Sequence, residues 1–194
     1  MSTMTPTRSQ VFNLPNQLTA ARVVLAIILF GLISLEWWWF CLAVFALAAL
    51  TDWLDGYFAR LHNLTSSLGR SFDPLADKVL ICGTYIFLLN VSEGRSGLTP
   101  WMVTLVVARE LIVTSLRTYL ETFGSRFGAD WLGKLKMGLQ CAAVIAIFVM
   151  LQNPKWLVGE WLRDGLIYAM LLVTLLSGLQ YLWRAALLIK TDAA

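Results

Sequence analysis

Hydrophobic residues in this chain are gathered into six long runs that short polar segments separate. The runs cover residues 17–36, 38–60, 74–92, 100–121, 132–152 and 164–189. A bilayer core requires about 20 mostly apolar residues per helix, and each run meets or approaches that length. Short connections favour packing of consecutive helices against one another. The pattern predicts an all-α integral membrane protein, a six-transmembrane-helix bundle forming one domain over residues 1–194 with a polar segment at 1–16.

Composition favours a membrane protein over a soluble one. Hydrophobic residues make up 58% of the chain and charged residues 14%, whereas about a quarter of a soluble domain is charged. As a soluble core, six such runs in 194 residues would leave almost nothing to cover them. Several tryptophans lie at the edges of the runs, where an amphipathic ring suits the headgroup layer: Trp37, Trp38, Trp39, Trp101, Trp131, Trp156 and Trp161. The net charge of +3 is too small to predict a nucleic-acid partner.

Lysine and arginine near the ends of the runs predict the orientation in the membrane. One side collects Arg8, Arg22, Arg60, Arg70, Lys78, Arg126, Lys134, Lys136, Arg184 and Lys190, and the other has Arg95, Lys155 and Arg163. Positive residues accumulate on the cytoplasmic side, so we expect a multi-pass protein of the cytoplasmic (inner) membrane with both termini in the cytoplasm. The first eleven residues are polar and no small-residue cleavage site follows the first run, so we expect no signal peptide.

Cysteine and histidine offer no separate chemistry. Cys41, Cys82 and Cys141 lie inside apolar runs without C-x-x-C spacing, and we expect them to be small buried hydrophobic residues. His62 is the only histidine and is expected to be an interfacial polar residue.

Four aspartates interrupt the apolar pattern where the second run ends and the third begins. Asp52, Asp55 and Ala59 are spaced i, i+3 and i+7, and Asp73 and Asp77 are spaced i, i+4, so each set shares one helix face. Ionisable groups at membrane depth are costly unless they are paired or bound to metal, which marks them as functional. If the two helices are neighbours, four carboxylates converge.

Converging carboxylates predict a divalent metal site next to a phosphate substrate. Four anions repel one another unless cations neutralise them, and hard oxygen ligands suit Mg²⁺ or Mn²⁺. Gly56 and Ala59 remove side-chain bulk from the same face, while Arg60 and Arg70 add positive charge in a form that binds phosphate bidentately.

One further feature and one alternative bear on single residues of this stretch. Asp73 and Pro74 have the form of a helix start, with Asp73 as N-cap and Pro74 at the first helical position. Charged residues at helix ends can also simply extend to the interface. That account suits Arg60, Arg70 or Lys78 taken singly, and it explains four aspartates at helical spacing poorly.

The stretch from residue 52 to residue 77 resembles the CDP-alcohol phosphotransferase family. It fills the pattern D-x-x-D-G-x-x-A-R-x8-G-x-x-x-D-x-x-x-D without a departure, with Asp52, Asp55, Gly56, Ala59, Arg60, Gly69, Asp73 and Asp77. The resemblance implies a six-helix membrane fold, a homodimer, an active site open to the cytoplasm, and transfer of a phosphatidyl group from CDP-diacylglycerol to an alcohol.

The resemblance also implies roles for the matched positions. Asp52, Asp55 and Asp73 are expected to bind two Mg²⁺ or Mn²⁺ ions, with Asp77 contributing to the second ion and acting as the catalytic base. The CDP moiety is expected to contact Asp52, Gly56, Ala59, Arg60, Gly69 and Asp73.

Three further segments resemble family members that use sn-glycerol 3-phosphate as the acceptor. The first is Asn13-Leu14-Pro15-Asn16-Gln17-Leu18-Thr19-Ala20-Ala21-Arg22, the second is Ala108-Arg109-Glu110 followed by Arg117, and the third is Gly133-Lys134-Leu135-Lys136 with Gln140. In the third segment Met137 stands where threonine is usual, which weakens that match.

Basic residues in the fourth and fifth runs agree with a phosphorylated acceptor. Arg109, Arg117, Lys134 and Lys136 lie inside or at the mouth of apolar helices, and Arg109 and Arg117 are eight positions apart, close to two full turns. The phosphate of sn-glycerol 3-phosphate would satisfy such a cluster. The alternative is that these residues contact lipid headgroups or pair with Glu110.

Other functions remain open on the sequence. A related enzyme could use phosphatidylglycerol, inositol phosphate, serine or choline as acceptor, although the basic helices argue against a neutral alcohol. A cation transporter would use the aspartates for a transported ion, and it predicts carboxylates near the bilayer midplane rather than near helix ends.

Overall fold

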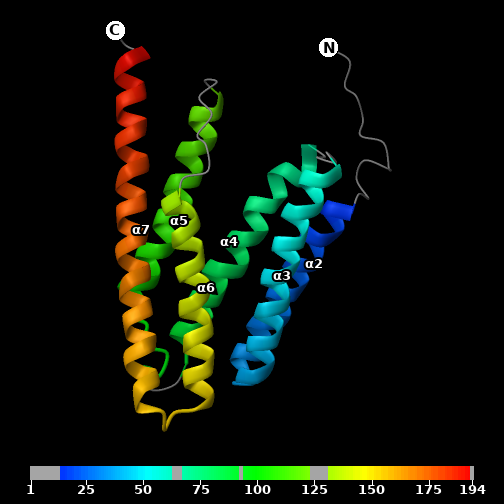
Figure 1. Cartoon of the computed structure of the whole chain (residues 1–194), viewed down its shortest axis with the longest axis vertical. Coiled ribbons are helices and arrows are strands. Elements are labelled where there is room, and N and C mark those ends of the chain that lie inside the picture. The colour runs from blue at the N-terminus through cyan, green and yellow to red at the C-terminus, as the bar shows by residue number, and fades with distance from the viewer. Residues whose placement is uncertain (1–13, 63–66, 92–93, 123–130, 193–194) are drawn as a thin grey trace. The chain divides into compact units, whose positions relative to one another are not determined.

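A computed structural model describes residues 14–62, 67–91, 94–122 and 131–192. In parts of these ranges, residues 52–62 and 67–74 among them, only the backbone is described. Within the described residues the chain forms helices and no strand (Figure 1). The helices are α2 (Leu14–Ser34), α3 (Trp38–His62), α4 (Ser67–Leu89), α5 (Pro100–Thr122), α6 (Trp131–Gln152) and α7 (Leu157–Asp192). The predicted all-α class is confirmed, and each predicted run falls on one helix.

Two helix boundaries differ from those predicted. The start expected at Asp73-Pro74 is wrong, because α4 already begins at Ser67. A proline removes only one backbone N–H, and tertiary packing can offset that local cost. The last helix is longer than the run 164–189 and extends from Leu157 to Asp192. Arg163 and Asp164 interrupt the apolar run there, but neither side chain prevents helical backbone hydrogen bonding.

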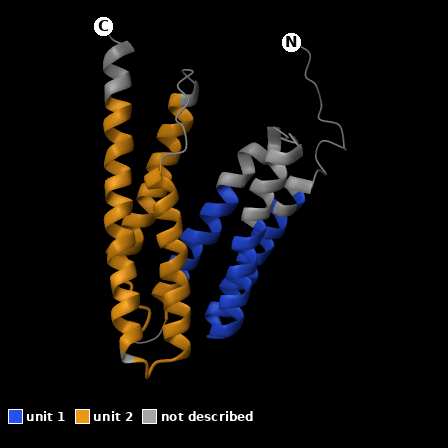
Figure 2. Ribbon diagram, viewed as in Figure 1, with its two compact units in different colours: residues 1–87 blue, residues 88–194 orange. Residues whose placement is uncertain are grey.

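The chain divides into two compact units, residues 1–87 and 88–194 (Figure 2). In unit 1, α2 and α3 pack side by side. Their buried positions recur every three or four residues, as expected for one apolar helix face: Ala26, Leu29 and Ile33 in α2, and Cys41, Phe45 and Ala48 in α3. The prediction that Cys41 is a buried hydrophobic residue is confirmed; Cys82 and Cys141 are only half-buried, and none of the three forms a disulfide.

Unit 1 also contains the contact between α2 and α4. The rings of Phe30 and Phe87 stack with centroids 4.7 Å apart and planes inclined by 7°. Gly83 lies directly beneath the Phe30 ring, where a Cβ atom would be only 2.2 Å from Phe30 Cζ. The absence of a side chain at residue 83 is therefore what lets the two helices approach at this point.

In unit 2, α7 packs against both α5 and α6. The buried face of α7 again follows helical spacing, with Ile167, Met170, Thr174, Ser177 and Tyr181. The connection before α5 is joined to α7 by Arg163, whose Nη1 donates a hydrogen bond to the Arg95 carbonyl at 2.8 Å. Gly97 lies against the Arg163 guanidinium with a φ of +73°, a backbone conformation that favours glycine.

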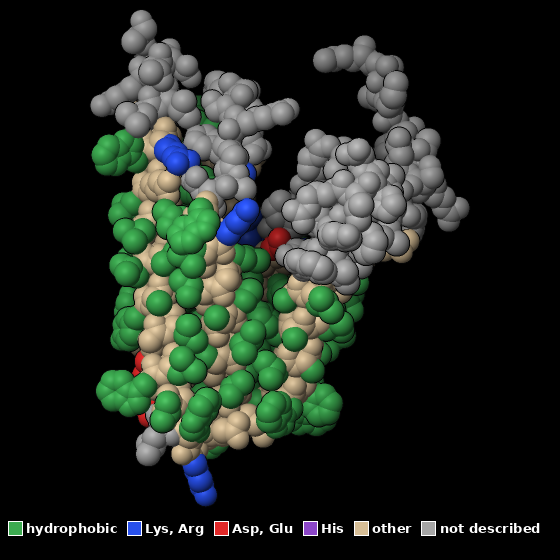
Figure 3. Space-filling view, in the orientation of Figure 1, with side chains coloured by type: hydrophobic (Ala, Val, Ile, Leu, Met, Phe, Trp, Pro, Cys, Tyr) green, Lys and Arg blue, Asp and Glu red, His purple; other side chains and the backbone are tan. Residues whose placement is uncertain are grey.

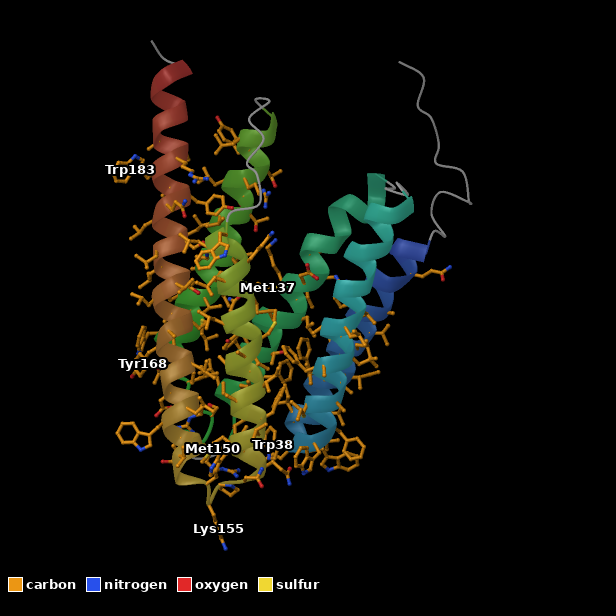
Figure 4. The ribbon with its side chains drawn as sticks, viewed as in Figure 1. Trp38, Met137, Met150, Lys155, Tyr168 and Trp183 are labelled. Atoms are coloured by element: carbon orange, nitrogen blue, oxygen red, sulfur yellow. The ribbon has the colours of Figure 1, made fainter. Side chains whose placement is uncertain are left out.

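Large apolar side chains also cover the outer faces of both units (Figure 3). On α7, Tyr168 and Trp183 point away from the helix (Figure 4) and are 60% and 70% exposed. Among the described residues, two stretches are long and apolar enough to cross a membrane, Trp131–Gln152 and Val158–Ala186. Shorter apolar stretches are Thr19–Ser34 and Trp38–Thr51. Passage of all six helices through the bilayer stays a prediction.

Candidate active site

The aspartate motif lies on the last turns of α3 and the first turns of α4. The backbone of both segments is helical. The side chains of Asp52, Asp55, Gly56, Ala59, Arg60, Gly69 and Asp73, like that of His62, lie outside the residues described. The convergence of the four carboxylates therefore stays a prediction. Asp77 is the motif position whose side chain is described.

Asp77 is paired with an arginine from another helix of unit 1. The Nη1 atom of Arg22, on α2, donates a hydrogen bond to Asp77 Oδ1 on α4 at 2.5 Å. The Arg22 side chain is 1% exposed, whereas the Asp77 side chain is 31% exposed. A buried guanidinium thus holds a carboxylate that still reaches solvent, which suits a carboxylate that must meet a substrate.

The basic residues of α5 and α6 meet at an acidic one within unit 2. Glu110, on α5, accepts hydrogen bonds from Lys136 Nζ and, at 3.4 Å, from Gln140 Nε2, both on α6. Arg109 Nη1 lies 3.4 Å from the same Glu110 oxygen, and Arg109 Nη2 donates to Ser177 Oγ on α7 at 2.5 Å. The structure therefore brings two of the four predicted phosphate-binding cations, Arg109 and Lys136, to one point.

The other two predicted cations lie in different surroundings. Arg117 is half-buried on α5, two turns after Arg109, and Lys134 is exposed on α6. Lys134 and Lys136 differ by two positions, which in a helix directs their side chains to different faces. Pairing with Glu110, the alternative left open by the sequence, is therefore observed for Arg109 and Lys136.

Two site features were missed by the sequence reasoning. In the sequence, Arg22 indicates only the membrane orientation and the N-terminal resemblance, and nothing points to Ser177. A signal for Arg22 was present, because a cation eight residues after Leu14, inside the apolar run 17–36, needs a partner. No comparable signal marks Ser177, since a serine satisfies its hydroxyl within its own helix as readily as across an interface.

The donor set of the motif suits a hard divalent cation. All four predicted ligands are aspartates, and carboxylate oxygens are the ligands that Mg²⁺ and Mn²⁺ prefer. Among the side chains that the structure describes, no three acidic, histidine or cysteine residues form a group. Three of the four aspartates lie outside that set, so metal binding stays a prediction.

Comparison with known proteins extends the short motif to most of the chain. Residues 12–176 match the CDP-alcohol phosphatidyltransferase family, and this region includes the aspartate motif, Arg22, and Glu110 with its partners Arg109, Lys136 and Gln140. The chain belongs to this family. Together with the two helices long enough to span a bilayer, family membership identifies a membrane protein.

Individual relatives are similar along nearly their whole length. A CDP-diacylglycerol–glycerol-3-phosphate 3-phosphatidyltransferase of Bacillus subtilis is 35% identical, over 90% of this chain and 97% of the relative. The protein of the same name from Escherichia coli K12 is 36% identical, over 90% of this chain and 95% of the relative. The Salmonella choleraesuis protein of this name is 35% identical with the same coverage.

Proposed function

We propose that this membrane enzyme transfers the phosphatidyl group of CDP-diacylglycerol to sn-glycerol 3-phosphate, giving phosphatidylglycerol phosphate and CMP. The observation that carries the proposal is similarity, over 90% of the chain, to enzymes named for this reaction. The complete aspartate motif and the cations of α5 and α6 support it independently, because one set suits a pyrophosphate donor and the other a phosphorylated acceptor.

The motif residues carry the reaction in this proposal. The primary hydroxyl of sn-glycerol 3-phosphate attacks the phosphorus that bears diacylglycerol, the new O–P bond forms, and the bond to CMP breaks. Asp77 takes the proton from that hydroxyl. Arg22 holds Asp77 in position through the 2.5 Å hydrogen bond. CMP leaves as the second product, so atoms and charge balance.

Donor binding falls to the remaining motif positions. Asp52, Gly56, Ala59, Arg60, Gly69 and Asp73 contact the CDP moiety in this proposal. Asp52, Asp55, Asp73 and Asp77 would hold two Mg²⁺ or Mn²⁺ ions, which when bound neutralise negative charge on the donor pyrophosphate.

Acceptor binding falls to Arg109, Arg117, Lys134 and Lys136. Arg109 and Lys136 can donate further hydrogen bonds beside those to Glu110, because a guanidinium carries five N–H groups and an ammonium three. A phosphate group can therefore bind the same two side chains, and Arg117 and Lys134 supply further positive charge.

The arrangement in the membrane follows from the charge distribution. We propose six spans, both termini and the active site on the cytoplasmic side, and a homodimer. Support comes from the apolar outer faces of both units and from the excess of lysine and arginine on one side of the predicted helices.

An acceptor panel tests the reaction. Purified protein in detergent receives CDP-diacylglycerol and Mg²⁺, and CMP release is measured with sn-glycerol 3-phosphate, inositol phosphate, phosphatidylglycerol or serine, each with an EDTA control. We expect EDTA-sensitive release with sn-glycerol 3-phosphate alone. Release only with another acceptor would overturn the acceptor, and no release with any of them would overturn the donor.

Arg117→Ala tests the acceptor pocket. The variant should raise the KM for sn-glycerol 3-phosphate by roughly tenfold or more, since a charge-assisted contact is lost, with less effect on the KM for CDP-diacylglycerol. Lys155→Ala is the matched control, because Lys155 is exposed in the connection between α6 and α7 (Figure 4). An unchanged acceptor KM in Arg117→Ala would remove Arg117 from the pocket.

A further inference from the structure

A buried ionic cluster joins three helices of unit 2, with Glu110 of α5 at its centre. Glu110 is 8% exposed, and Lys136, which contacts it from α6, is 5% exposed. Gln140 donates to the same carboxylate oxygen and is completely buried. Burial of a carboxylate and an ammonium is unfavourable unless each is paired and hydrogen-bonded. Separating the two charges in this buried position would cost free energy, so Glu110 holds the Lys136 side chain in place.

Arg109 is fixed by the same cluster and by α7. Its Nη1 atom lies 3.4 Å from Glu110 Oε1, and its Nη2 atom donates to the buried Ser177 hydroxyl at 2.5 Å. The next residue on α7, Gly178, leaves room for the aliphatic part of Arg109, since a Cβ atom there would lie 3.3 Å from Arg109 Cγ. The guanidinium is therefore held from two sides, by a carboxylate and by a hydroxyl.

The cluster retains positive charge and hydrogen-bonding capacity. Among the cluster's side chains that the structure describes, Arg109 and Lys136 contribute two positive charges and Glu110 one negative charge, a surplus of one. The Nε atom of Arg109 is buried and has no hydrogen-bond partner within the part of the chain that the structure describes. A surplus cation with an unused donor suits an anionic ligand.

We propose that Glu110 is a positioning residue of the acceptor site. It holds Arg109 and Lys136 side by side so that both bind the phosphate of sn-glycerol 3-phosphate, and it does not itself contact the acceptor. This inference rests on the proposed function. Two flexible cations would otherwise repel each other and lose conformational freedom on binding, so fixing them beforehand raises affinity for the phosphate.

Glu110→Gln tests the inference, because it keeps the shape and removes the charge. We expect the KM for sn-glycerol 3-phosphate to rise about tenfold or more and the KM for CDP-diacylglycerol to stay within about twofold. Glu110→Asp keeps the charge and should show a smaller rise. Glu160→Gln, on the exposed first turn of α7, is the matched control and should match the wild type.

The outcomes separate this inference from the proposed function. Wild-type protein that releases no CMP with sn-glycerol 3-phosphate contradicts the proposed function itself. With active wild type, an unchanged or lower acceptor KM in Glu110→Gln overturns the positioning role, because Glu110 would then only compete with the phosphate. Equal rises in both KM values also overturn it, since they indicate a general structural defect.

Ser177→Ala provides a second variant if Glu110→Gln does not fold. It removes only the hydroxyl that accepts from Arg109, and alanine suits a helix. We expect a rise of roughly threefold or more in the acceptor KM, again without a matching rise for the donor. No change in the acceptor KM of this variant would contradict the inference as well.

Discussion

At the scale of single residues, each unit contains buried charges that pair across its own helices. Arg22 with Asp77 in unit 1, and Glu110 with Lys136 and Arg109 in unit 2, each combine a nearly buried cation with a carboxylate. Removing one partner of such a pair leaves an uncompensated charge, which costs more than the pair itself contributes. Substitutions at these residues therefore affect both activity and stability, and the measurements must separate the two.

Asp77→Asn should lower the turnover number by at least about a hundredfold while the protein still folds. The amide has the shape of the carboxylate but cannot take the proton from the acceptor hydroxyl. CMP release measures activity, and circular dichroism with thermal unfolding in detergent checks the fold. Asp164→Asn is a suitable control, because Asp164 pairs with its neighbour Arg163 on α7 and is not a motif residue. Turnover of Asp77→Asn close to that of the wild type would show that Asp77 is not the base.

Arg22→Gln should lower the turnover number about tenfold and Arg22→Lys less. A hydrogen bond to a charged group contributes about 1.5–3 kcal/mol, and the partial exposure of Asp77 favours the lower end of that range. Lysine keeps the charge but not the planar geometry of the guanidinium. Steady-state kinetics of both variants beside Arg184→Gln, an exposed arginine of α7, provides the comparison. If both Arg22 variants kept full turnover, Asp77 would not need this partner.

At the scale of helices, close approach depends on small residues at defined contact points. Gly83 admits the Phe30 ring between α2 and α4, and Gly178 leaves room for Arg109 between α5 and α7. In a membrane, lipid competes with apolar helix contacts, so tight packing at small residues contributes a large share of helix association. A larger side chain at such a point therefore separates two helices rather than adding apolar contact.

Gly83→Ala should destabilise the protein by about 1–3 kcal/mol, because the new methyl group overlaps a ring that is already stacked on Phe87. Gly31→Ala on α2 is the matched control, since nothing lies within 4 Å of a Cβ atom there. Alanine in a helix is favoured over glycine by about 1 kcal/mol, so the control should be neutral or more stable. Thermal unfolding in detergent compares the two variants. Equal unfolding temperatures would contradict the role given to residue 83.

At the scale of the whole molecule, the outer faces of both units are apolar, and exposed lysines lie near both ends of α6. Lys155 lies in the connection after α6 (Figure 4), whereas Lys134 lies in the first turns of α6 and is also exposed. A helix of 22 residues is about 33 Å long, enough to cross the hydrocarbon core. The proposed orientation therefore separates these two lysines by the membrane.

Lys155→Cys and Lys134→Cys, each in a cysteine-free background, test this orientation. In intact cells a membrane-impermeant maleimide should label Lys155→Cys and leave Lys134→Cys unlabelled, because only the connection after α6 faces away from the cytoplasm in the proposal. Labelling of both variants after the cells are opened confirms that each thiol is accessible. The reverse pattern in intact cells would invert the orientation.

Much of the fold could be read from the order of residues along the chain. Each long apolar run became a helix, as expected of segments that cross a bilayer, which must satisfy their backbone hydrogen bonds within themselves. That requirement is local, so run length and run position are sufficient to predict the helices. The exceptions were the starts of α4 and α7. Pro74 in α4, and Arg163 and Asp164 in α7, interrupt the apolar run but not the helix.

The sequence also determined the family, since eight positions at fixed spacing are recognisable without coordinates, and it predicts the chemistry of the aspartate motif. Only the tertiary structure decided which charges pair. Arg22 and Asp77 are 55 positions apart, Glu110 and Lys136 are 26 apart, and Arg109 and Ser177 are 68 apart. Such pairs depend on which helices are neighbours and on how each is rotated about its axis. A shift of one residue along a helix turns the side chain by about 100° around that axis.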